Sequence, residues 1–174
     1  MVKERTGVYS VRDNPLTLLG AELKVGAKAP GFSLISNDMQ PVTLADSKGK
    51  TRIIAPVVSL DTGVCDQESK KFNEMASQLP NVEIIVVSKD LPFAQKRWCG
   101  ANNVENIQTL SAYRDDSAFG LDFGILVKET RLLARSIFVV DADDVVQYTQ
   151  YIPNLLDLPD FDSAAAAAKK ASGG

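Results

Sequence analysis

The stretch RIIAPVVSLDTGVC (residues 52–65) predicts a β-strand that leads directly into an α-helix. Residues 53–60 are nearly all apolar and rich in β-branched side chains, which is typical of a strand covered on both faces in a parallel sheet. Asp61 and Thr62 follow, and either can cap a helix that begins at about Val64. A strand followed at once by a helix indicates an α/β protein.

A second strand and a second helix continue this pattern. The first helix is expected to run to Pro80, because apolar residues recur at helical spacing along one face: Phe72, Met75, Ala76 and Leu79. NVEIIVVS (81–88) then predicts another buried strand, and DLPFAQKRWCG (90–100) a short helix with Gly100 just beyond its last turn. Cys99 is therefore expected at the C-terminal end of that helix.

The rest of the chain adds further elements around this unit. A hairpin is expected over 8–19, because Arg-Asp-Asn-Pro contains turn formers, and it should decorate one end of the core. The remaining expected elements are strands at 32–35, 42–44 and 107–111, a helix at 116–124, a hairpin at 134–152 and an alanine-rich helix at 159–170. The order βαβαβα followed by ββα resembles the thioredoxin fold with an N-terminal β-hairpin extension.

The size and charge of the chain limit its possible functions. Its 174 residues, 45% of them hydrophobic, suffice for one core, so residues 1–174 are expected to form a single domain. A formal net charge of −3 provides no basic face, which makes nucleic acids and membrane surfaces poor partners. The sequence has no apolar run typical of a signal peptide or a membrane span. We therefore expect a soluble, cytoplasmic protein.

The chain contains no histidine and only two cysteines, Cys65 and Cys99. The missing imidazole excludes Ser-His-Asp triads, Cys-His pairs and histidine-bound metals, and two thiols are too few for a cysteine-only zinc site. A separation of 34 positions also excludes the C-x-x-C motif of a disulfide oxidoreductase, and a structural disulfide is not expected in a reducing cytosol. Two interpretations remain: inert buried thiols, or a reactive pair that bonds transiently.

The predicted position of Cys65 favours a reactive thiol. In the first turn of a helix, unpaired backbone N–H groups and the positive end of the helix dipole stabilise a thiolate without any histidine. A nearby arginine would strengthen the effect. An inert core thiol is the alternative, because Cys65 shares a helical face with Phe72 and Leu79 and cysteine is among the most frequently buried residues.

Three segments together resemble the thiol peroxidase subfamily of the peroxiredoxins. They are SLDTGVC with KKFNEMA after it, SKDLPFAQKRWCGANNVENIQTLSAYRD, and LLARSIFVVDADDVVQYTQYI. They occur in the family's order over nearly the whole chain, and the motifs DTGVC and DLPFAQKRWCG each surround one cysteine. The resemblance implies a thioredoxin-like fold and a peroxidase that reduces hydrogen peroxide and organic hydroperoxides with no metal, flavin or haem cofactor.

The resemblance also implies roles for individual residues. Cys65 matches the peroxidatic cysteine, which peroxide oxidises to a sulfenic acid, and Cys99 matches the resolving cysteine, which closes a disulfide with it in the same chain. Thr62 matches a hydroxyl that assists the thiol or the peroxide, and Arg135 an arginine that stabilises negative charge, with Arg131 as a competing candidate. Thioredoxin would restore the thiols, and the protein would form a homodimer.

One position departs from the wider peroxiredoxin signature P-x-x-x-T-x-x-C, because Val58 stands where the signature has proline. That proline shapes the loop before the cysteine, so its absence makes the conformation of this loop a question for the structure. It also leaves an alternative function open. On the same fold, Cys65 and Cys99 could serve as a non-enzymatic redox sensor or binding module that switches conformation for a protein partner.

Overall fold

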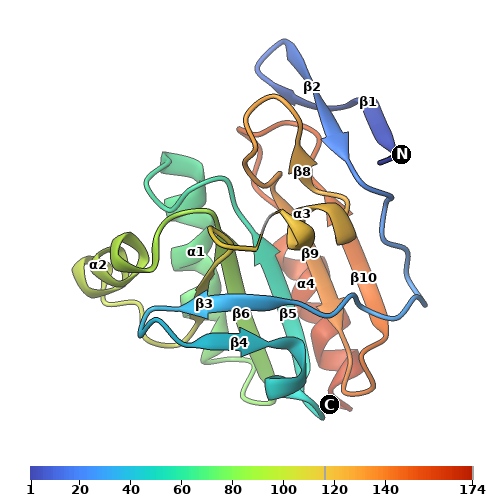
Figure 1. Ribbon diagram of the computed structural model, residues 1–174. Helices are drawn as coiled ribbons and strands as arrows, with labels where there is room; N and C mark the ends of the chain where they lie inside the picture. Colours follow the sequence, from blue (N-terminus) through green and yellow to red (C-terminus); the bar gives the residue numbers. More distant parts are fainter. Residues whose placement is uncertain (116, 174) are drawn as a thin grey trace.

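The computed structural model describes residues 1–115 and 117–173, and a seven-stranded sheet forms its centre (Figure 1). The strands of this sheet are β3 (Ser33–Ser36), β4 (Pro41–Thr43), β5 (Thr51–Pro56), β6 (Val82–Ser88), β7 (Gln108–Ser111), β9 (Ser136–Val140) and β10 (Val146–Tyr151). Their spatial order is β10-β9-β5-β6-β7-β3-β4. Strands β5, β6 and β7 are parallel, and the outer strands are antiparallel to their neighbours. The two strands predicted to be most buried, β5 and β6, thus lie at the centre.

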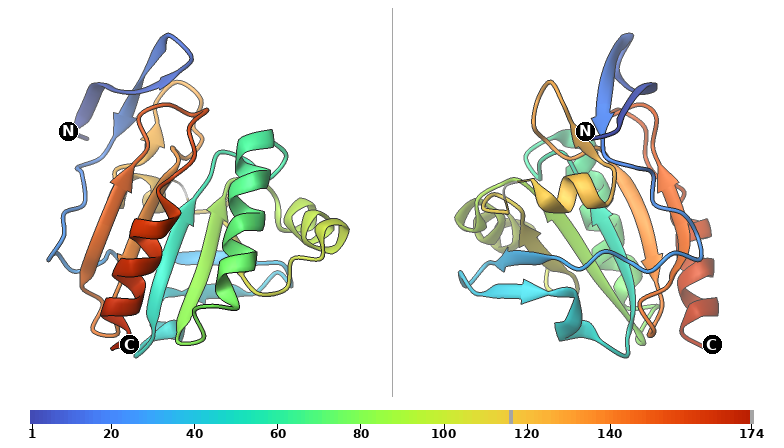
Figure 2. Two further views of the ribbon diagram at one scale, coloured as in Figure 1. Left: turned by 180° about the vertical axis from the view of Figure 1, so that it is seen from behind. Right: turned by 45° about the vertical axis from the view of Figure 1, so that its right-hand side comes forward.

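Helices cover the central strands on both faces. The helices are α1 (Gly63–Ala76), α2 (Pro92–Asn102), α3 (Ala118–Asp122) and α4 (Phe161–Ala171), with a short 3-10 helix, η1 (Leu44–Ser47). Figure 2 shows α1 and α4 side by side on one face of the sheet. On that face Ile53 of β5 belongs to a cluster with Phe72 of α1, whereas Ile54 belongs to a second cluster with Phe119 of α3. Strand β5 is buried on both faces, as its apolar sequence predicts.

The predicted N-terminal hairpin is present. It consists of β1 (Glu4–Val11) and β2 (Asn14–Leu19), so it begins earlier than the predicted start at residue 8. Its tight turn places Arg12 in the left-handed region (φ 54°), and Pro15 lies within β2. The two-residue strand β8 (Leu126–Val127) pairs with β2 and was not predicted, because so short a strand has no periodicity to detect.

Two predicted boundaries near the cysteines are wrong. Strand β5 ends at Pro56 rather than Leu60, because Ser59 and Leu60 hydrogen-bond to the Asp90 carboxylate instead of to a neighbouring strand. Helix α2 passes through Gly100 instead of ending before it. It ends where Asn103 adopts the left-handed conformation (φ 53°) and donates its N–H to the Cys99 carbonyl. Cys99 therefore lies inside the last turn of α2.

Two other helices are shorter than predicted. Helix α1 ends at Ala76, and turn-type hydrogen bonds from the N–H groups of Gln78 and Leu79 lead the chain onward before Pro80. Helix α3 covers only the middle of the range predicted at 116–124, since Gly124 leaves the helical conformation at φ 66°. Asp116, the first residue of that range, lies outside the described residues, as does Gly174 at the end of the predicted domain.

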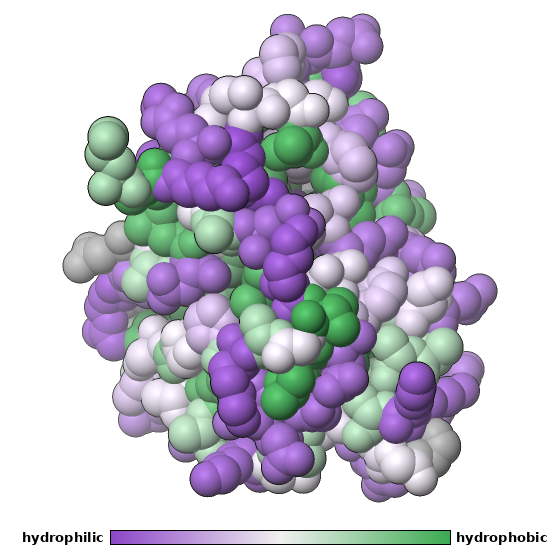
Figure 3. All heavy atoms as spheres, turned by 90° about the vertical axis from the view of Figure 1, so that its right-hand side faces the viewer, coloured by the Kyte–Doolittle hydropathy of each residue, from purple (hydrophilic) through white to green (hydrophobic). Residues whose placement is uncertain are grey.

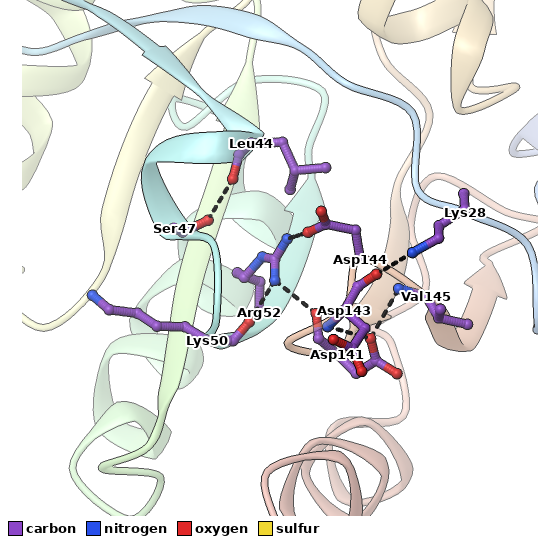
Figure 4. Close-up of polar contacts among 9 residues, drawn as sticks. All are labelled: Lys28, Leu44, Ser47, Lys50, Arg52, Asp141, Asp143, Asp144 and Val145. Carbon is purple, nitrogen blue, oxygen red and sulfur yellow. Dashed lines mark hydrogen bonds and ion pairs between the residues drawn. The ribbon is translucent and has the colours of Figure 1, made fainter.

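A buried arginine, Arg52, lies at the start of β5, at the end of the strand away from Cys65 (Figure 4). Its guanidinium pairs with Asp144 and donates to the Asp141 carbonyl oxygen at 2.7 Å. Both partners belong to the turn between β9 and β10. Arg52 therefore joins the first residues of β5 to that turn and takes no part in the surroundings of either cysteine.

The exterior is mixed in polarity. On the side of the molecule seen in Figure 3, hydrophobic side chains occur in small groups among hydrophilic ones. Elsewhere Leu91 and Phe93, at the start of α2, and Tyr113, just after β7, are exposed apolar residues. They follow the carboxyl ends of β6 and β7. Because β5, β6 and β7 are parallel, these residues lie at the same edge of the sheet as the turn that precedes Cys65. Within residues 1–115 and 117–173, no helix is long and apolar enough to cross a membrane.

Candidate active site

Cys65 lies in the first turn of α1, directly after the loop that follows β5. Thr62 occupies the N-cap position with an extended backbone, which confirms the predicted start of the helix. The Cys65 side chain has no exposed surface. Its position near unpaired helix N–H groups favours the thiolate over the thiol.

The Thr62 hydroxyl points to the loop rather than to the thiol. It donates to the carbonyl oxygen of Ser59 at 3.0 Å, and it makes no capping hydrogen bond to the helix. Among the described residues, Thr62 and Cys65 share no side-chain hydrogen bond. Thr62 therefore lies one turn before the sulfur, and its hydroxyl proton is directed to Ser59, which leaves the hydroxyl oxygen as an acceptor.

Arg135 is the arginine at the thiol. It comes from the segment just before β9, its side chain has no exposed surface, and its Nη2 lies 3.3 Å from Cys65 Sγ. The same nitrogen donates to the Leu155 carbonyl at 3.0 Å. Arg131, the competing candidate, instead donates to the Ser117 hydroxyl at 3.2 Å. The fold therefore distinguishes two arginines that the sequence left as alternatives.

Glu68 is a third member of this cluster, and the sequence analysis did not identify it. It lies three residues after Cys65 on α1, and its fully buried carboxylate pairs with Arg135 Nη1. Spacing of three places two residues on one helix face, so C-x-x-E was a detectable signal. Burial raises the pKa of Glu68 to about 7, and the charge of Arg135 counters part of this rise.

The charges of the site act on Arg135 as well. Burial by itself lowers the pKa of Arg135, but the charges of Glu68 and Cys65 and their hydrogen bonds outweigh it, so the pKa is raised. The guanidinium therefore stays positively charged. A permanent cation beside a buried sulfur favours the thiolate.

The N-terminal hairpin contributes to the site instead of only decorating the core. Tyr9 of β1 is buried, and burial raises its pKa to about 12, with Arg135 lowering it and Cys65 raising it. Next to it, the Ser10 N–H donates to Pro153 and the Ser10 carbonyl accepts from Leu155. Leu155 in turn accepts from Arg135. The hairpin thus supports the segment that holds the guanidinium.

Asp90, in the loop before α2, forms hydrogen bonds with the loop before Cys65. Its carboxylate accepts hydrogen bonds from Ser59 Oγ (2.7 Å), the Leu60 N–H (2.8 Å) and Ser88 Oγ (2.8 Å). Ser59 also holds the Thr62 hydroxyl through its carbonyl. Such charge-assisted bonds are stronger than neutral ones. Asp90 was missed by the sequence analysis because its partners come from two different strand ends.

Val58 is accommodated in the loop without exposure of its side chain. It is 7% exposed and belongs to the same hydrophobic cluster as Cys65 and Trp98. The loop is held by the polar contacts of Asp90 on one side and by this apolar packing on the other. The residue that replaces the signature proline therefore belongs to the hydrophobic core that also contains Cys65.

Cys99 is partly exposed on α2 and has its own polar neighbours. Its Sγ lies 3.5 Å from Thr109 Oγ1 and 3.9 Å from Asn37 Nδ2, and both cysteines are free thiols. The preceding residue, Trp98, donates its indole N–H to Asp66 Oδ1 at 3.0 Å. Because Asp66 follows Cys65, this bond brings the two cysteine-bearing helices into contact while each sulfur keeps separate partners.

The side chains around the thiols differ from a metal centre. Within the described part of the chain, no three histidine, cysteine or carboxylate side chains are grouped so as to hold a metal ion. The site contains the buried Cys65 thiol at a helix N-terminus, the Arg135 guanidinium that contacts this thiol, and the Glu68 carboxylate that pairs with the guanidinium. This set can stabilise a nucleophilic sulfur and the negative charge that forms on an oxygen it attacks.

Comparisons with known proteins agree with this chemistry. The Redoxin family model matches residues 24–167. A thiol peroxidase of Halalkalibacterium halodurans is 53% identical over 160 residues, covering 92% of this chain and 96% of that protein. A thiol peroxidase of Bacillus subtilis is 47% identical over 158 residues, covering 91% and 94%.

A solved structure is similar along nearly the whole chain. The crystal structure of a peroxiredoxin-like protein from Aquifex aeolicus superposes with a TM-score of 0.88 at 37% sequence identity, covering 97% of this chain and 98% of that one. With the Redoxin match, this similarity confirms the predicted α/β, thioredoxin-like fold.

Proposed function

The chain belongs to the thiol peroxidases of the peroxiredoxin family and is a peroxiredoxin-type peroxidase, and from this premise we propose that Cys65 is its peroxidatic residue. The observation that carries the proposal is the contact of Arg135 Nη2 with Cys65 Sγ at 3.3 Å, in a buried site at a helix N-terminus. Both features favour a thiolate, which is the form of cysteine that attacks peroxides.

In the proposed reaction, the Cys65 thiolate attacks the terminal oxygen of a hydroperoxide. A sulfur–oxygen bond forms, the oxygen–oxygen bond breaks, and the remaining alkoxide or hydroxide takes up a proton and leaves as alcohol or water. The sulfur becomes a sulfenic acid. Arg135 stabilises the negative charge as it passes from sulfur to oxygen, and Thr62 orients the peroxide through its hydroxyl oxygen, which remains an acceptor while the hydroxyl donates to Ser59.

Cys99 is the proposed resolving residue. Its thiolate attacks the sulfur of the Cys65 sulfenic acid, so that a disulfide forms, the sulfur–oxygen bond breaks, and the expelled hydroxide takes up a proton to become water. The contact between Trp98 and Asp66 joins α2 to α1 beside both cysteines. Each sulfur has separate partners in the reduced protein, and we propose that the end of α2 rearranges so that the sulfurs can bond. The exposed apolar residues at the start of α2 and after β7 support docking of a protein reductant, for which we propose thioredoxin. The family resemblance further leads us to propose a homodimer and a cytoplasmic location.

A coupled turnover assay tests this function. Reduced protein is mixed with thioredoxin, thioredoxin reductase and NADPH, and hydrogen peroxide or cumene hydroperoxide is added in excess. We expect NADPH consumption to continue through many turnovers and to depend on both the protein and thioredoxin. Oxidation that stops after one equivalent, with no sustained consumption, would instead support a redox sensor.

One equivalent of hydrogen peroxide is expected to remove both free thiols and to leave a Cys65–Cys99 disulfide within a single chain. The chain has no third cysteine, so the product is limited to this bond or to bonds between chains. Non-reducing electrophoresis and peptide mapping distinguish the two. A product that consists mainly of disulfide-linked dimers would contradict the role of Cys99.

A further inference from the structure

Two acids and one base are buried together at the N-terminus of α1. The side chains of Glu68 and Arg135 have no exposed surface, and Cys65 is equally buried. Arg135 contacts both acids, with Nη1 on the Glu68 carboxylate and Nη2 on Cys65 Sγ at 3.3 Å. One guanidinium therefore serves two groups that can each carry a negative charge.

A single positive charge can balance only one of these acids. If Cys65 and Glu68 were both ionised, the buried site would carry a net negative charge, which a low-dielectric environment disfavours. If both were protonated, Arg135 would be a buried cation without a counter-ion. The electrically neutral arrangement keeps one proton for the two acids, and acids related in this way titrate as a coupled pair.

We propose that Glu68 is the proton partner of Cys65: the reactive thiolate forms with the proton held on Glu68, and the two groups titrate as one pair around Arg135. The inference rests on the proposed role of Cys65 as the peroxidatic residue. It gives the thiol a base in a chain that has no histidine. The other oxygen of Glu68, Oε1, is buried with no hydrogen-bond partner in the described residues, so the carboxylate is incompletely solvated by the protein.

The proton balance of the reaction follows from this arrangement. First, the Cys65 thiol and the Glu68 carboxylate become a thiolate and a carboxylic acid. The thiolate then attacks the hydroperoxide, and the sulfur becomes a neutral sulfenic acid while an alkoxide or hydroxide is expelled. With no anion left on the sulfur, Arg135 again favours the Glu68 carboxylate, whose released proton balances the leaving group as alcohol or water. The charge beside Arg135 stays constant throughout.

Other titratable groups around the pair do not replace Glu68. Tyr9, from the hairpin, has its pKa raised to about 12 by burial and is neutral at physiological pH. Asp66, on the same helix, is turned toward Trp98 and Lys70. The segment after β10 contacts the guanidinium through the neutral Leu155 carbonyl. The raised pKa of Glu68, about 7, is in keeping with a carboxyl that holds a proton near neutral pH.

Glu68 could instead serve only to position Arg135. The two roles predict opposite changes in the pH at which the Cys65 thiolate forms when Glu68 is replaced. If Glu68 only orients Arg135, its loss loosens the guanidinium and the Cys65 thiolate forms at higher pH. If Glu68 competes with the thiolate for the charge of Arg135, its loss frees that charge and the thiolate forms at lower pH. The Glu68→Gln variant retains a side-chain oxygen that can accept a hydrogen bond from Arg135. It therefore differs from the unsubstituted protein mainly in having no acid at this position.

The first measurement is the ultraviolet absorbance of the thiolate against pH in a Cys99→Ser background, where Cys65 is the only thiol. We expect Glu68→Gln to lower the titration midpoint by about one pH unit or more. Glu74→Gln is the matched control on the same helix, because the Glu74 carboxylate is exposed and pairs with Lys71, and it should not move the midpoint. An unchanged or raised midpoint in Glu68→Gln would overturn the proposal.

A second measurement needs no substitution of Glu68. The infrared carbonyl band of a buried carboxylic acid is followed against pH in the reduced protein and in Cys65→Ser. Thermodynamic linkage requires the two substitutions to have equal effects. Removing Cys65 must shift the titration midpoint of Glu68 by the same amount, and in the same direction, as removing Glu68 shifts the titration midpoint of Cys65. We expect the band to persist to higher pH when Cys65 is present. A band with the same midpoint in both proteins would refute the coupling.

Neither measurement uses peroxide or thioredoxin. A protein that reduces peroxides normally but shows no coupled titration would refute the role of Glu68 alone. A coupled titration in a protein without peroxidase turnover would refute the proposed function and leave the pair intact.

Discussion

Replacement of Cys65 by serine is expected to abolish hydroperoxide reduction, leaving only the background rate of the assay. Serine keeps the size of the buried side chain, but its hydroxyl stays protonated beside Arg135 and cannot act as the nucleophile that a thiolate is. The coupled NADPH assay measures the loss, and the thermal unfolding of the variant verifies that it is folded. Peroxidase activity that survives in folded Cys65→Ser would show that another group performs the chemistry.

The matched variant, Cys99→Ser, is expected to behave differently. Cys65 keeps its helix N-terminus and its contact with Arg135, so it should still react once with peroxide and then stop as a sulfenic acid. Dimedone labelling followed by mass determination detects this product. If Cys99→Ser lost the first reaction while Cys65→Ser retained it, the two roles would be reversed.

Local patterns predicted the elements that carry the chemistry. The apolar run at 53–60 and the helical spacing after it place Cys65 in the first turn of α1, because both signals lie within a few residues of the structure they specify. The errors are local too. The pattern predicts the end of α2 at Gly100 because glycine commonly takes the left-handed conformation that ends a helix, but in the structure Asn103 takes that conformation instead.

Contacts between distant segments were beyond the reach of sequence patterns. The resemblance assigns the role to Arg135 in LLAR with Arg131 as a competing candidate, and only the fold shows which of them reaches a sulfur far earlier in the chain. Glu68 has a readable spacing from Cys65, but its burial depends on Arg135 arriving from the segment before β9. Tyr9 was assigned to a decorative hairpin because nothing in its local sequence indicates a neighbour near the thiol.

Arg135→Met is expected to slow the reaction of Cys65 with peroxide by about tenfold or more at neutral pH. A guanidinium in hydrogen-bonding reach favours an adjacent anion by about one to three pKa units, on the order of 1–4 kcal/mol. It also stabilises the negative charge developing on the leaving oxygen, which exists only in the transition state. Methionine keeps the length of the side chain and removes the charge.

The substitution has a side effect that the experiment must separate. Without Arg135, fully buried Glu68 loses its counter-ion and the cation that lowers its pKa, so it is expected to take up a proton at neutral pH, at a cost in stability. The doubly substituted protein, Arg135→Met with Glu68→Gln, removes this buried acid as well. We expect it to be more stable than Arg135→Met and to remain slow, because the missing cation is what limits the rate.

Stopped-flow rates against pH separate the two contributions of Arg135. A higher pH should restore the part of the loss that comes from a smaller thiolate fraction, and a residual deficit should remain once the thiol is fully ionised. The rate deficit that remains measures the loss of transition-state stabilisation, because the ionisation of the thiol no longer differs between the two proteins. Arg131→Met is the control, since Arg131 contacts Ser117 and not the thiol. A defect in Arg131→Met with a normal profile in Arg135→Met would show that the other arginine serves the thiol in solution.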